Sequence, residues 1–262
     1  MRILILGGTA EASALAKLLA GDARFQPTLS LAGRTASPAT PPIPYRIGGF
    51  GGADGLADYI KAERVCAMVD ATHPFAARIS ANAVSAARAA GIPLASLVRP
   101  GWTRSEGDRW IAVQSPEEAA AALGPAPRIV FLATGRLELP AFAAAPHHSY
   151  IARVIDHPGD VALPPNIEFI YSRGPYDAAS ETRLLTERRA EVVVSKNSGG
   201  AATYGKIEAA RALGLPVVMI ERPHKPAGTI VNGSAEALRW LASILPSQAN
   251  RHPGKAEPYP GS

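Results

Sequence analysis

Cysteine is almost absent from this chain of 262 residues, which contains only Cys66. A single thiol excludes a disulfide within the chain and a metal site built from several cysteines. Because Cys66 lies in the apolar stretch 65–69, we expect its thiol to be buried and inert. No second histidine or cysteine stands at helical spacing from His73, so we expect no bound metal.

Aromatic residues are also scarce, at 6% of the chain, and they do not alternate with basic runs as the stacking surfaces of nucleic-acid-binding proteins do. Lysine and arginine are scattered, and none of their groupings resembles a basic arm. We therefore expect no nucleic acid as a partner. The net charge of +5 and the pI near 9.5 still favour an anionic ligand, such as a polycarboxylate.

Long apolar runs are missing as well. The first one, Met1 to Leu6, is too short for a signal peptide, and no later one reaches the ~18 residues of a membrane span. We expect a cytoplasmic protein without membrane contact. Hydrophobic residues at 47% and charged residues at 19% are typical of a soluble globular protein, and the length allows two small domains.

Short apolar segments alternate with longer helical patterns, which predicts parallel strands with helices as crossovers. The alternation breaks at Arg99-Pro100-Gly101-Trp102, where proline prevents a continuous helix or central strand. We predict an α/β fold of two Rossmann-like domains, with mainly parallel sheets and an interdomain cleft for cofactor and substrate. The predicted divisions are a first domain at 1–98, a second at 99–245 and a flexible tail at 246–262. Strands are predicted at 2–6, 28–31, 65–70, 93–98, 110–113, 129–132, 150–153, 167–171, 192–195 and 217–220, helices at 10–20, 75–89, 116–123, 178–188, 204–213 and 235–244, and an irregular loop across the proline-rich 36–44 and glycine-rich 48–55.

The first candidate site follows the first predicted strand and reads Gly7-Gly8-Thr9-Ala10-Glu11. Glycines at this turn allow a close backbone approach, and the free amides of a helix start favour a phosphate. The spacing is not GxGxxG, and a plain strand-to-helix turn needs glycine too. Thr9 can cap the helix or bind a phosphate, and Glu11 suits the first turn because its charge faces the helix dipole.

The second candidate is Arg34-Thr35, which follows the second predicted strand, where a dinucleotide fold meets the adenosine ribose. An acid here would select NAD, whereas a guanidinium and a hydroxyl suit a 2′-phosphate. We therefore predict NADPH/NADP+ as the cofactor. An exposed loop arginine is the alternative.

The third candidate is Asp70-Ala71-Thr72-His73-Pro74-Phe75, again at a strand end. Ligands of open α/β sheets bind at the carboxyl ends of the strands, so we predict that Thr72, His73 and Pro74 face the cofactor. His73 can also serve in proton transfer, or can simply hydrogen-bond its own loop.

The fourth candidate lies in the second domain, where a buried strand leads into Ser195-Lys196-Asn197-Ser198-Gly199-Gly200 and then Tyr204. A lysine, several hydrogen-bond donors and two glycines at a helix start suit anionic groups. Arginines follow other strands at Arg136, Arg153 and Arg173, and their planar guanidinium groups suit carboxylates. We predict a substrate site formed by Arg136, Arg173, Lys196, Ser198, Gly199 and Gly200.

Four of these motifs together resemble the precorrin-6A reductase family: Gly7 to Glu11, Asp70 to Phe75, Ala133-Thr134-Gly135-Arg136 and Ser195 to Gly200. The resemblance runs from the first strand to about Pro223. It implies NADPH-dependent reduction of one carbon–carbon double bond in the precorrin-6A macrocycle, a tetrapyrrole, giving a precorrin-6B-type dihydro product in cobalamin biosynthesis.

The resemblance also implies how the residues divide. Gly7, Gly8, Thr9, Arg34, Thr72 and His73 would contact the dinucleotide, and Arg136, Lys196, Ser198, Gly199 and Tyr204 would face the macrocycle or the reacting end of the cofactor. The proton would come from His73, Lys196, Tyr204 or water. Three alternatives stay open: the cobalt form of the macrocycle as substrate, another anionic substrate, and a sensor that binds without turnover. We expect a monomer or a weak homodimer.

Overall fold

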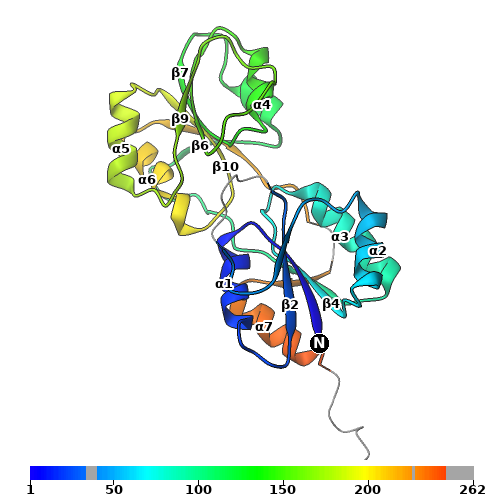
Figure 1. Ribbon diagram of the computed structural model, residues 1–262. Helices are drawn as coiled ribbons and strands as arrows, with labels where there is room; N and C mark the ends of the chain where they lie inside the picture. The colour runs from blue at the N-terminus through cyan, green and yellow to red at the C-terminus, as the bar shows by residue number, and fades with distance from the viewer. Residues whose placement is uncertain (34–39, 226–227, 246–262) are drawn as a thin grey trace, which may run out of the picture.

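The computed structural model describes residues 1–33, 40–225 and 228–245. It forms two lobes, each a parallel sheet with helices on both faces (Figure 1). The tail predicted at 246–262 lies outside the described residues. No helix in the described ranges is long and apolar enough to cross a membrane.

The first unit contains a six-stranded sheet in the order β12-β5-β4-β1-β2-β3, and every pairing is parallel. This is the strand order of a dinucleotide-binding fold, with β12 in the place of the sixth strand. The strands are β1 (Arg2–Leu6), β2 (Gln26–Leu31), β3 (Tyr45–Ile47), β4 (Ala67–Asp70), β5 (Leu94–Leu97) and β12 (Thr229–Val231), and the helices are α1 (Ala10–Leu19), α2 (Ala53–Ala62), α3 (Ala77–Ala90) and α7 (Ser234–Ser243).

Alternation along β1 builds two cores. Ile3 and Ile5 pack with residues of α1 and α7 on one face of the sheet, whereas Leu4 and Leu6 pack with residues of α2 and α3 on the other. Successive side chains of a strand point to opposite faces, so a strand apolar at every position must be covered on both sides. The continuous apolar run at 3–6 therefore places β1 at the centre of the sheet.

The second unit repeats the plan with the order β6-β11-β10-β7-β8-β9, again entirely parallel. Residues of α4 and the short helix η1 cover one face, and residues of α5 and α6 cover the other. The strands are β6 (Arg109–Val113), β7 (Ile129–Ala133), β8 (Ser149–Val154), β9 (Ile167–Tyr171), β10 (Val192–Lys196) and β11 (Pro216–Ile220), and the helices are α4 (Pro116–Ala122), η1 (Leu139–Ala144), α5 (Ala178–Glu187), η2 (Ala201–Thr203) and α6 (Gly205–Ala212).

The end of the chain corrects the predicted division into domains. The segment β12 pairs with β5 of the first sheet, with Val231 opposite Leu97, and α7 contributes Ala237 and Leu241 to the core beside α1. The assignment of 229–245 to the second domain is therefore wrong. The last strand and helix complete the first unit because β5 would otherwise be an edge strand with one face of the sheet partly uncovered.

Two further expectations are corrected. The segment predicted as an irregular loop contains β3 and most of the first turn of α2, which buries Leu56, Ala57 and Ile60. Cys66 is exposed, because β4 begins one residue later and the thiol donates to the carbonyl of Arg64.

Each sheet has one point at which the strand order reverses. In the first sheet β1 and β4 are neighbours and the later strands extend away from them in opposite directions; β7 and β10 play the same part in the second. Ligands of open α/β sheets bind beyond the carboxyl ends of the strands at such a point. The loops that follow β1, β4, β7 and β10 contain all four sequence motifs.

Candidate active site between the two strand edges

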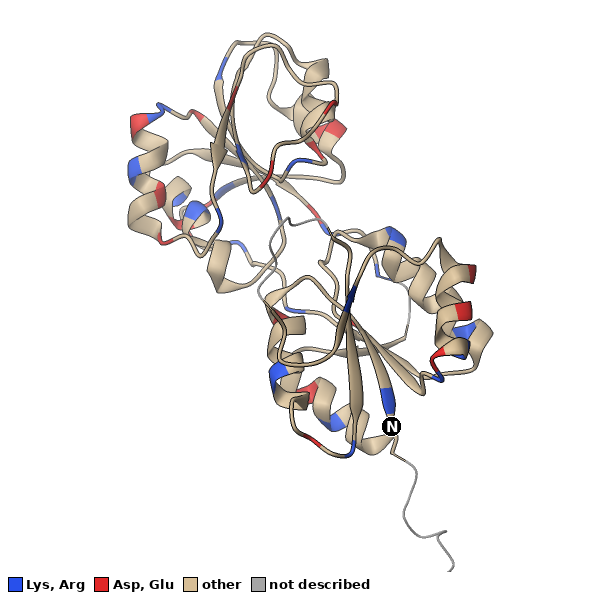
Figure 2. Cartoon of the chain, viewed as in Figure 1, with Lys and Arg blue, Asp and Glu red and all other residues tan. Residues whose placement is uncertain are grey.

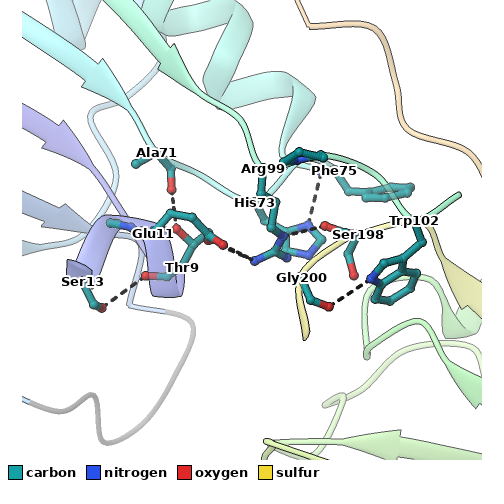
Figure 3. A network of polar contacts seen from close by, with 12 residues as sticks. Thr9, Glu11, Ser13, Ala71, His73, Phe75, Arg99, Trp102, Ser198 and Gly200 are labelled. Carbon is teal, nitrogen blue, oxygen red and sulfur yellow. Dashed lines mark hydrogen bonds and ion pairs between the residues drawn. The ribbon is translucent and has the colours of Figure 1, made fainter. Parts of the chain in front are cut away.

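The carboxyl ends of the two sheets face each other. The loop 7–11 after β1 reaches Arg99, and Arg99 also contacts the loop 197–200 after β10 (Figure 3). Phe75, which follows β4, packs against the core of the second unit. We call this region the junction: the loops after β1, β4, β7 and β10, with the two chain segments that connect the units.

The loop after β1 has the geometry predicted for it. A side chain at Gly7 would place Cβ 2.5 Å from Leu29 Cδ1, and Gly8 has a φ of +109°. Thr9 is the N-cap of α1: its hydroxyl accepts from the amide of Ala12 at 3.1 Å and donates to the carbonyl of Ala71 at 2.8 Å. Of the two roles predicted for Thr9 the structure shows the cap, which also ties this loop to the end of β4.

Two other residues predicted for the cofactor begin helix α1. Ala10 opens α1 at the surface, whereas Glu11 accepts two hydrogen bonds from Arg99, at 3.1 and 3.0 Å. The predicted 2′-phosphate ligands Arg34 and Thr35 lie outside the described residues.

The loop after β4 is organised by Asp70, which is 1% exposed. One carboxylate oxygen accepts from the amide and the hydroxyl of Thr72, and the other accepts from Ser80 at 2.6 Å and from Lys225 at 2.9 Å. Burial raises the pKa of Asp70, but the charge of Lys225 and these hydrogen bonds outweigh it and hold the pKa below its ordinary value. Asp70 is thus an ionised anchor for the loop and no proton donor.

His73 lies in the same loop, next to the buried Pro74. Its Nδ1 accepts from the amide of Phe75 at 3.2 Å, which places the hydrogen of the neutral ring on Nε2. Burial, and after it the nearby positive charges, lower the pKa of His73 to about 3. These charges come from the second unit and from both connecting segments: Lys196, Arg99, Arg222 and Lys225.

Lys196 crosses the junction from the end of β10. Its ammonium donates to Glu138 at 2.9 Å and lies 5.3 Å from the centre of the Phe75 ring of the first unit. Lys196 therefore lies close enough to the loop after β4 for its charge to act on His73. Glu138 was not predicted, and it follows the Arg136 motif by only two residues.

The glycine-rich loop after Lys196 is held tightly. The carbonyl of Ser198 accepts from Arg99 at 2.6 Å, and the carbonyl of Gly200 accepts from the indole of Trp102 at 3.0 Å. At Gly199, φ is +67° and a Cβ would lie 2.1 Å from the carbonyl oxygen of Pro100. Glycine is required there because the backbone of a connecting segment passes directly against it.

The hydroxyl of Tyr204 is bound within the second unit. It accepts from Arg211 at 2.7 Å, and Arg211 also pairs with Asp108 inside the second unit. Arg136 donates to the carbonyl of His157 at 3.3 Å, and Arg173 is exposed beyond β9. The side-chain hydrogen bonds described for Tyr204 and Arg136 therefore run to residues other than His73 and Lys196.

Lys206 was not among the site residues predicted from the sequence. Burial lowers its pKa to about 7, and its ammonium donates to the carbonyl of Thr203 at 2.6 Å and lies 4.7 Å from the centre of the Trp102 ring. A second lysine in the motif that opens α6 was the available signal. Within the described ranges, no group of three or more histidine, cysteine, aspartate or glutamate residues could hold a metal.

Comparison with known proteins shows the family to which this chain belongs. The model of the family described as "Precorrin-6x reductase CbiJ/CobK" matches residues 2–242. A precorrin-6A reductase of a Sinorhizobium species is 53% identical, over 93% of this chain and 94% of its own, and one of Rhodobacter capsulatus is 47% identical, over 92% and 96%. A solved structure of a CobK precorrin-6A reductase superposes with a TM-score of 0.87 at 47% identity, covering 93% of this chain and 96% of that one. The chain therefore belongs to the precorrin-6x reductase family.

Proposed function

We propose that this protein reduces one carbon–carbon double bond of the precorrin-6A macrocycle with NADPH and releases the precorrin-6B-type dihydro product of cobalamin biosynthesis. One observation carries the proposal: the switch points of both sheets meet at a single junction, where four cationic side chains act on the neutral His73. Such a junction suits an anionic dinucleotide and a substrate rich in carboxylates.

The residues described at the first switch point fit the pyrophosphate of NADPH. In the loop 7–9, a Cβ at Gly7 would clash with the end of the Leu29 side chain and Gly8 has a left-handed φ, and the loop leads into the capped start of the ten-residue helix α1. Close backbone approach and the positive end of the helix dipole both favour phosphate. We assign Gly7 to Glu11 and Thr72 to Pro74 to the dinucleotide, and Arg34 with Thr35 to its 2′-phosphate.

The second unit suits a flat, carboxylate-bearing macrocycle. Large apolar side chains are exposed at the carboxyl ends of three neighbouring strands: Leu137 after β7, Ile155 after β8 and Tyr171 at the end of β9. Arg136 and Arg173 stand in the same loops, and basic residues also lie near the point where the lobes meet (Figure 2). We assign the substrate to these arginines with Lys196, Ser198, Gly199 and Gly200.

The relatives favour the metal-free form of the substrate. Those named precorrin-6A reductase are 45% to 53% identical to this chain, whereas a cobalt-precorrin-6A reductase of Priestia megaterium is 28% identical. We therefore propose metal-free precorrin-6A rather than its cobalt complex.

When bound, NADPH supplies the hydride that is added to one carbon of the double bond. The adjacent carbon needs a proton, and we assign its delivery to Lys196, whose ammonium carries an available proton and is oriented by Glu138. His73 is unsuited to this role: with a pKa of about 3, roughly one ring in ten thousand is charged at pH 7. Its Nε2–H can still donate a hydrogen bond that orients a bound ligand. The hydroxyl of Tyr204 is engaged by Arg211.

We further propose that the enzyme acts in the cytoplasm as a monomer or a weak homodimer. The small-molecule substrate and the absence of a membrane-spanning helix within the described ranges support this placement. Sedimentation velocity at micromolar concentration checks the oligomeric state, and a tight complex of higher order would refute it.

The test of the proposed function is the consumption of NADPH, followed by its absorbance, with precorrin-6A, its cobalt complex, or no substrate. NADH replaces NADPH in parallel, and Arg34→Ala is compared with Arg88→Ala, an exposed arginine of α3. A charge-assisted hydrogen bond contributes about 1.5 to 3 kcal/mol, so we expect kcat/KM for NADPH to fall roughly ten- to hundredfold in Arg34→Ala alone.

Turnover with the cobalt complex alone would reverse the choice of substrate. If neither form is turned over, two alternatives remain for this protein: an oxidoreductase that acts on another anionic substrate, and a sensor that binds its ligand without turnover. A preference for NADH, or an unchanged Arg34→Ala, would refute the assignment of the 2′-phosphate.

A further inference from the structure

Two segments connect the units, and both are bound to the same loop of the second unit. The first connector is residues 98–108 and the second is residues 221–225. Asn197 makes two hydrogen bonds with the backbone of Trp102: its Oδ1 accepts from the amide at 2.8 Å, and its Nδ2 donates to the carbonyl at 3.2 Å. Arg222 donates to the carbonyls of Asn197, Arg99 and Pro100 at 2.6, 2.7 and 3.1 Å. These hydrogen bonds fix both connectors to the loop 197–200, so we expect the connectors and the loop to move together.

Each connector also extends one cation to a carboxylate of the first unit. Arg99 of the first connector pairs with Glu11, and Lys225 of the second pairs with Asp70. These acids belong to neighbouring strand ends, because Leu6 of β1 lies opposite Asp70 of β4. The two ion pairs thus join the second unit to adjacent points at one edge of the first sheet.

The two pairs differ in how firmly they are held. Asp70 is 1% exposed and accepts further hydrogen bonds from Thr72 and Ser80, so its pair with Lys225 is a fixed point. The side chains of Arg99 and Glu11 are 18% and 23% exposed. The side chains of Lys225 and Asp70 are 12% and 1% exposed, so the pair of Arg99 and Glu11 is the more exposed of the two, and exposure to water weakens an ion pair. The pair of Arg99 and Glu11 is therefore the contact that can respond to a ligand.

Arg99 is the residue at which the two predicted ligand loops meet. Its Nη1 donates to both carboxylate oxygens of Glu11 in the loop 7–11, and its Nε donates to the carbonyl of Ser198 in the loop 197–200 (Figure 3). The guanidinium is planar, so these two contacts are held in a fixed relation that a lysine could not reproduce. If Glu11 moves, Arg99 moves with it and shifts the backbone of the loop 197–200 at Ser198.

We propose that Arg99 is a positioning residue that couples the two ligand sites: NADPH or NADP+ at the loop 7–11 fixes Glu11, and Arg99 then holds the loop 197–200 in the arrangement that binds the macrocycle. This inference rests on the proposed function. Coupling between sites is reciprocal, so the macrocycle must tighten dinucleotide binding by the same factor.

The experiment measures the Kd of NADP+ with and without saturating precorrin-6A, a pair that cannot react because the dinucleotide is already oxidised. For the unchanged protein we expect precorrin-6A to tighten NADP+ at least about fivefold, the low end of coupling between sites. In Arg99→Met, Arg99→Lys and Glu11→Gln we expect the factor to fall toward one. Arg104→Met is the matched control, because Arg104 lies on the same connector but binds only the carbonyl of Asp108 among the contacts described for its side chain.

A second measurement follows hydrogen exchange of the backbone amides at 195–203. We expect NADP+ to slow this exchange in the unchanged protein and in Arg104→Met, but not in the three other variants, whose exchange in β7 and β10 reports that they are folded. Coupling retained in Arg99→Met, or lost equally in Arg104→Met, would overturn the inference. No binding of NADP+ to the unchanged protein would instead overturn the proposed function, and the inference with it.

Discussion

We predict that His73 stays uncharged well below the pH at which an ordinary histidine titrates. Its pKa is about 3 in the folded protein, lowered first by burial and then by Lys196, Arg99, Arg222 and Lys225, against about 6.5 in an unfolded chain. The unfolded state thus binds more protons between these two values, so His73 lowers the stability of the fold as pH falls from about 6.5 toward 3. Above pH 6.5 this penalty is absent.

The magnitude follows from the two pKa values. Between pH 7.5 and pH 5 the unfolded histidine gains most of a proton and the folded one almost none, which amounts to about 2 kcal/mol in the free energy of unfolding. His73→Gln removes this contribution. The pH dependence of unfolding by urea should therefore be shallower in His73→Gln by about that amount, whereas other groups such as Asp70 contribute equally to both proteins.

The direct assay is an NMR titration of the imidazole rings from pH 8 to pH 4. The chain has six histidines, and the signals missing from His73→Gln identify the ring of interest. We expect those signals to keep the chemical shifts of a neutral ring down to pH 4. We expect Lys196→Met to raise the pKa of His73, because Lys196 is the neighbouring charge that lowers this pKa most. A midpoint between pH 6 and 7 in the unchanged protein would refute the reasoning and would readmit His73 as a proton donor.

Two further predictions concern stability. Thr9→Ala should cost about 1 kcal/mol because the cap of α1 is lost, whereas Thr9→Ser should retain most of it; equal losses in urea unfolding would show that the hydroxyl is not the cause. Glu181→Gln should cost about 3 to 5 kcal/mol because Arg153, paired with it at 2.6 Å and 8% exposed, is left buried with no opposite charge. Glu168→Gln, in the exposed pair with Arg188, is the control and should cost less than about 1 kcal/mol; similar losses in both would contradict the argument from burial.

The sequence predicted the strands that lie at the centres of the two sheets. Residues 3–6, 67–69, 129–132 and 192–194 are apolar at every position because these strands are covered on both faces, and such runs are visible without a structure. The motifs of the site were found for the same reason, since each follows one of these buried strands. The family resemblance, confirmed by the comparisons, added the chemistry.

Two edge strands and the helix α2 escaped prediction. The strands β3 and β12 have three residues each, and their pairing is decided by partners distant in the chain. The helix α2 begins at Ala53 within a glycine-rich stretch, and its apolar face is too short to stand out before packing is known.

The residues that join the two halves of the site were missed because they carry no local pattern. Arg99, Arg222 and Lys225 stand beside prolines in segments that predict only a break in secondary structure. Their roles come from contacts with residues up to 155 positions away in the chain, as for Lys225 and Asp70. Distance in sequence of that order leaves no periodicity to detect.

The return of β12 and α7 to the first sheet has a consequence for biosynthesis. A nascent chain that has emerged only as far as residue 228 already contains every strand of the second sheet, so that lobe can fold while translation continues. The first unit still lacks β12 and α7, one of the two helices that pack against Ile3 and Ile5 on one face of its central strand. The first unit is thus completed after the second, and termination near residue 228 would release a chain with every strand of the second sheet but an incomplete first core.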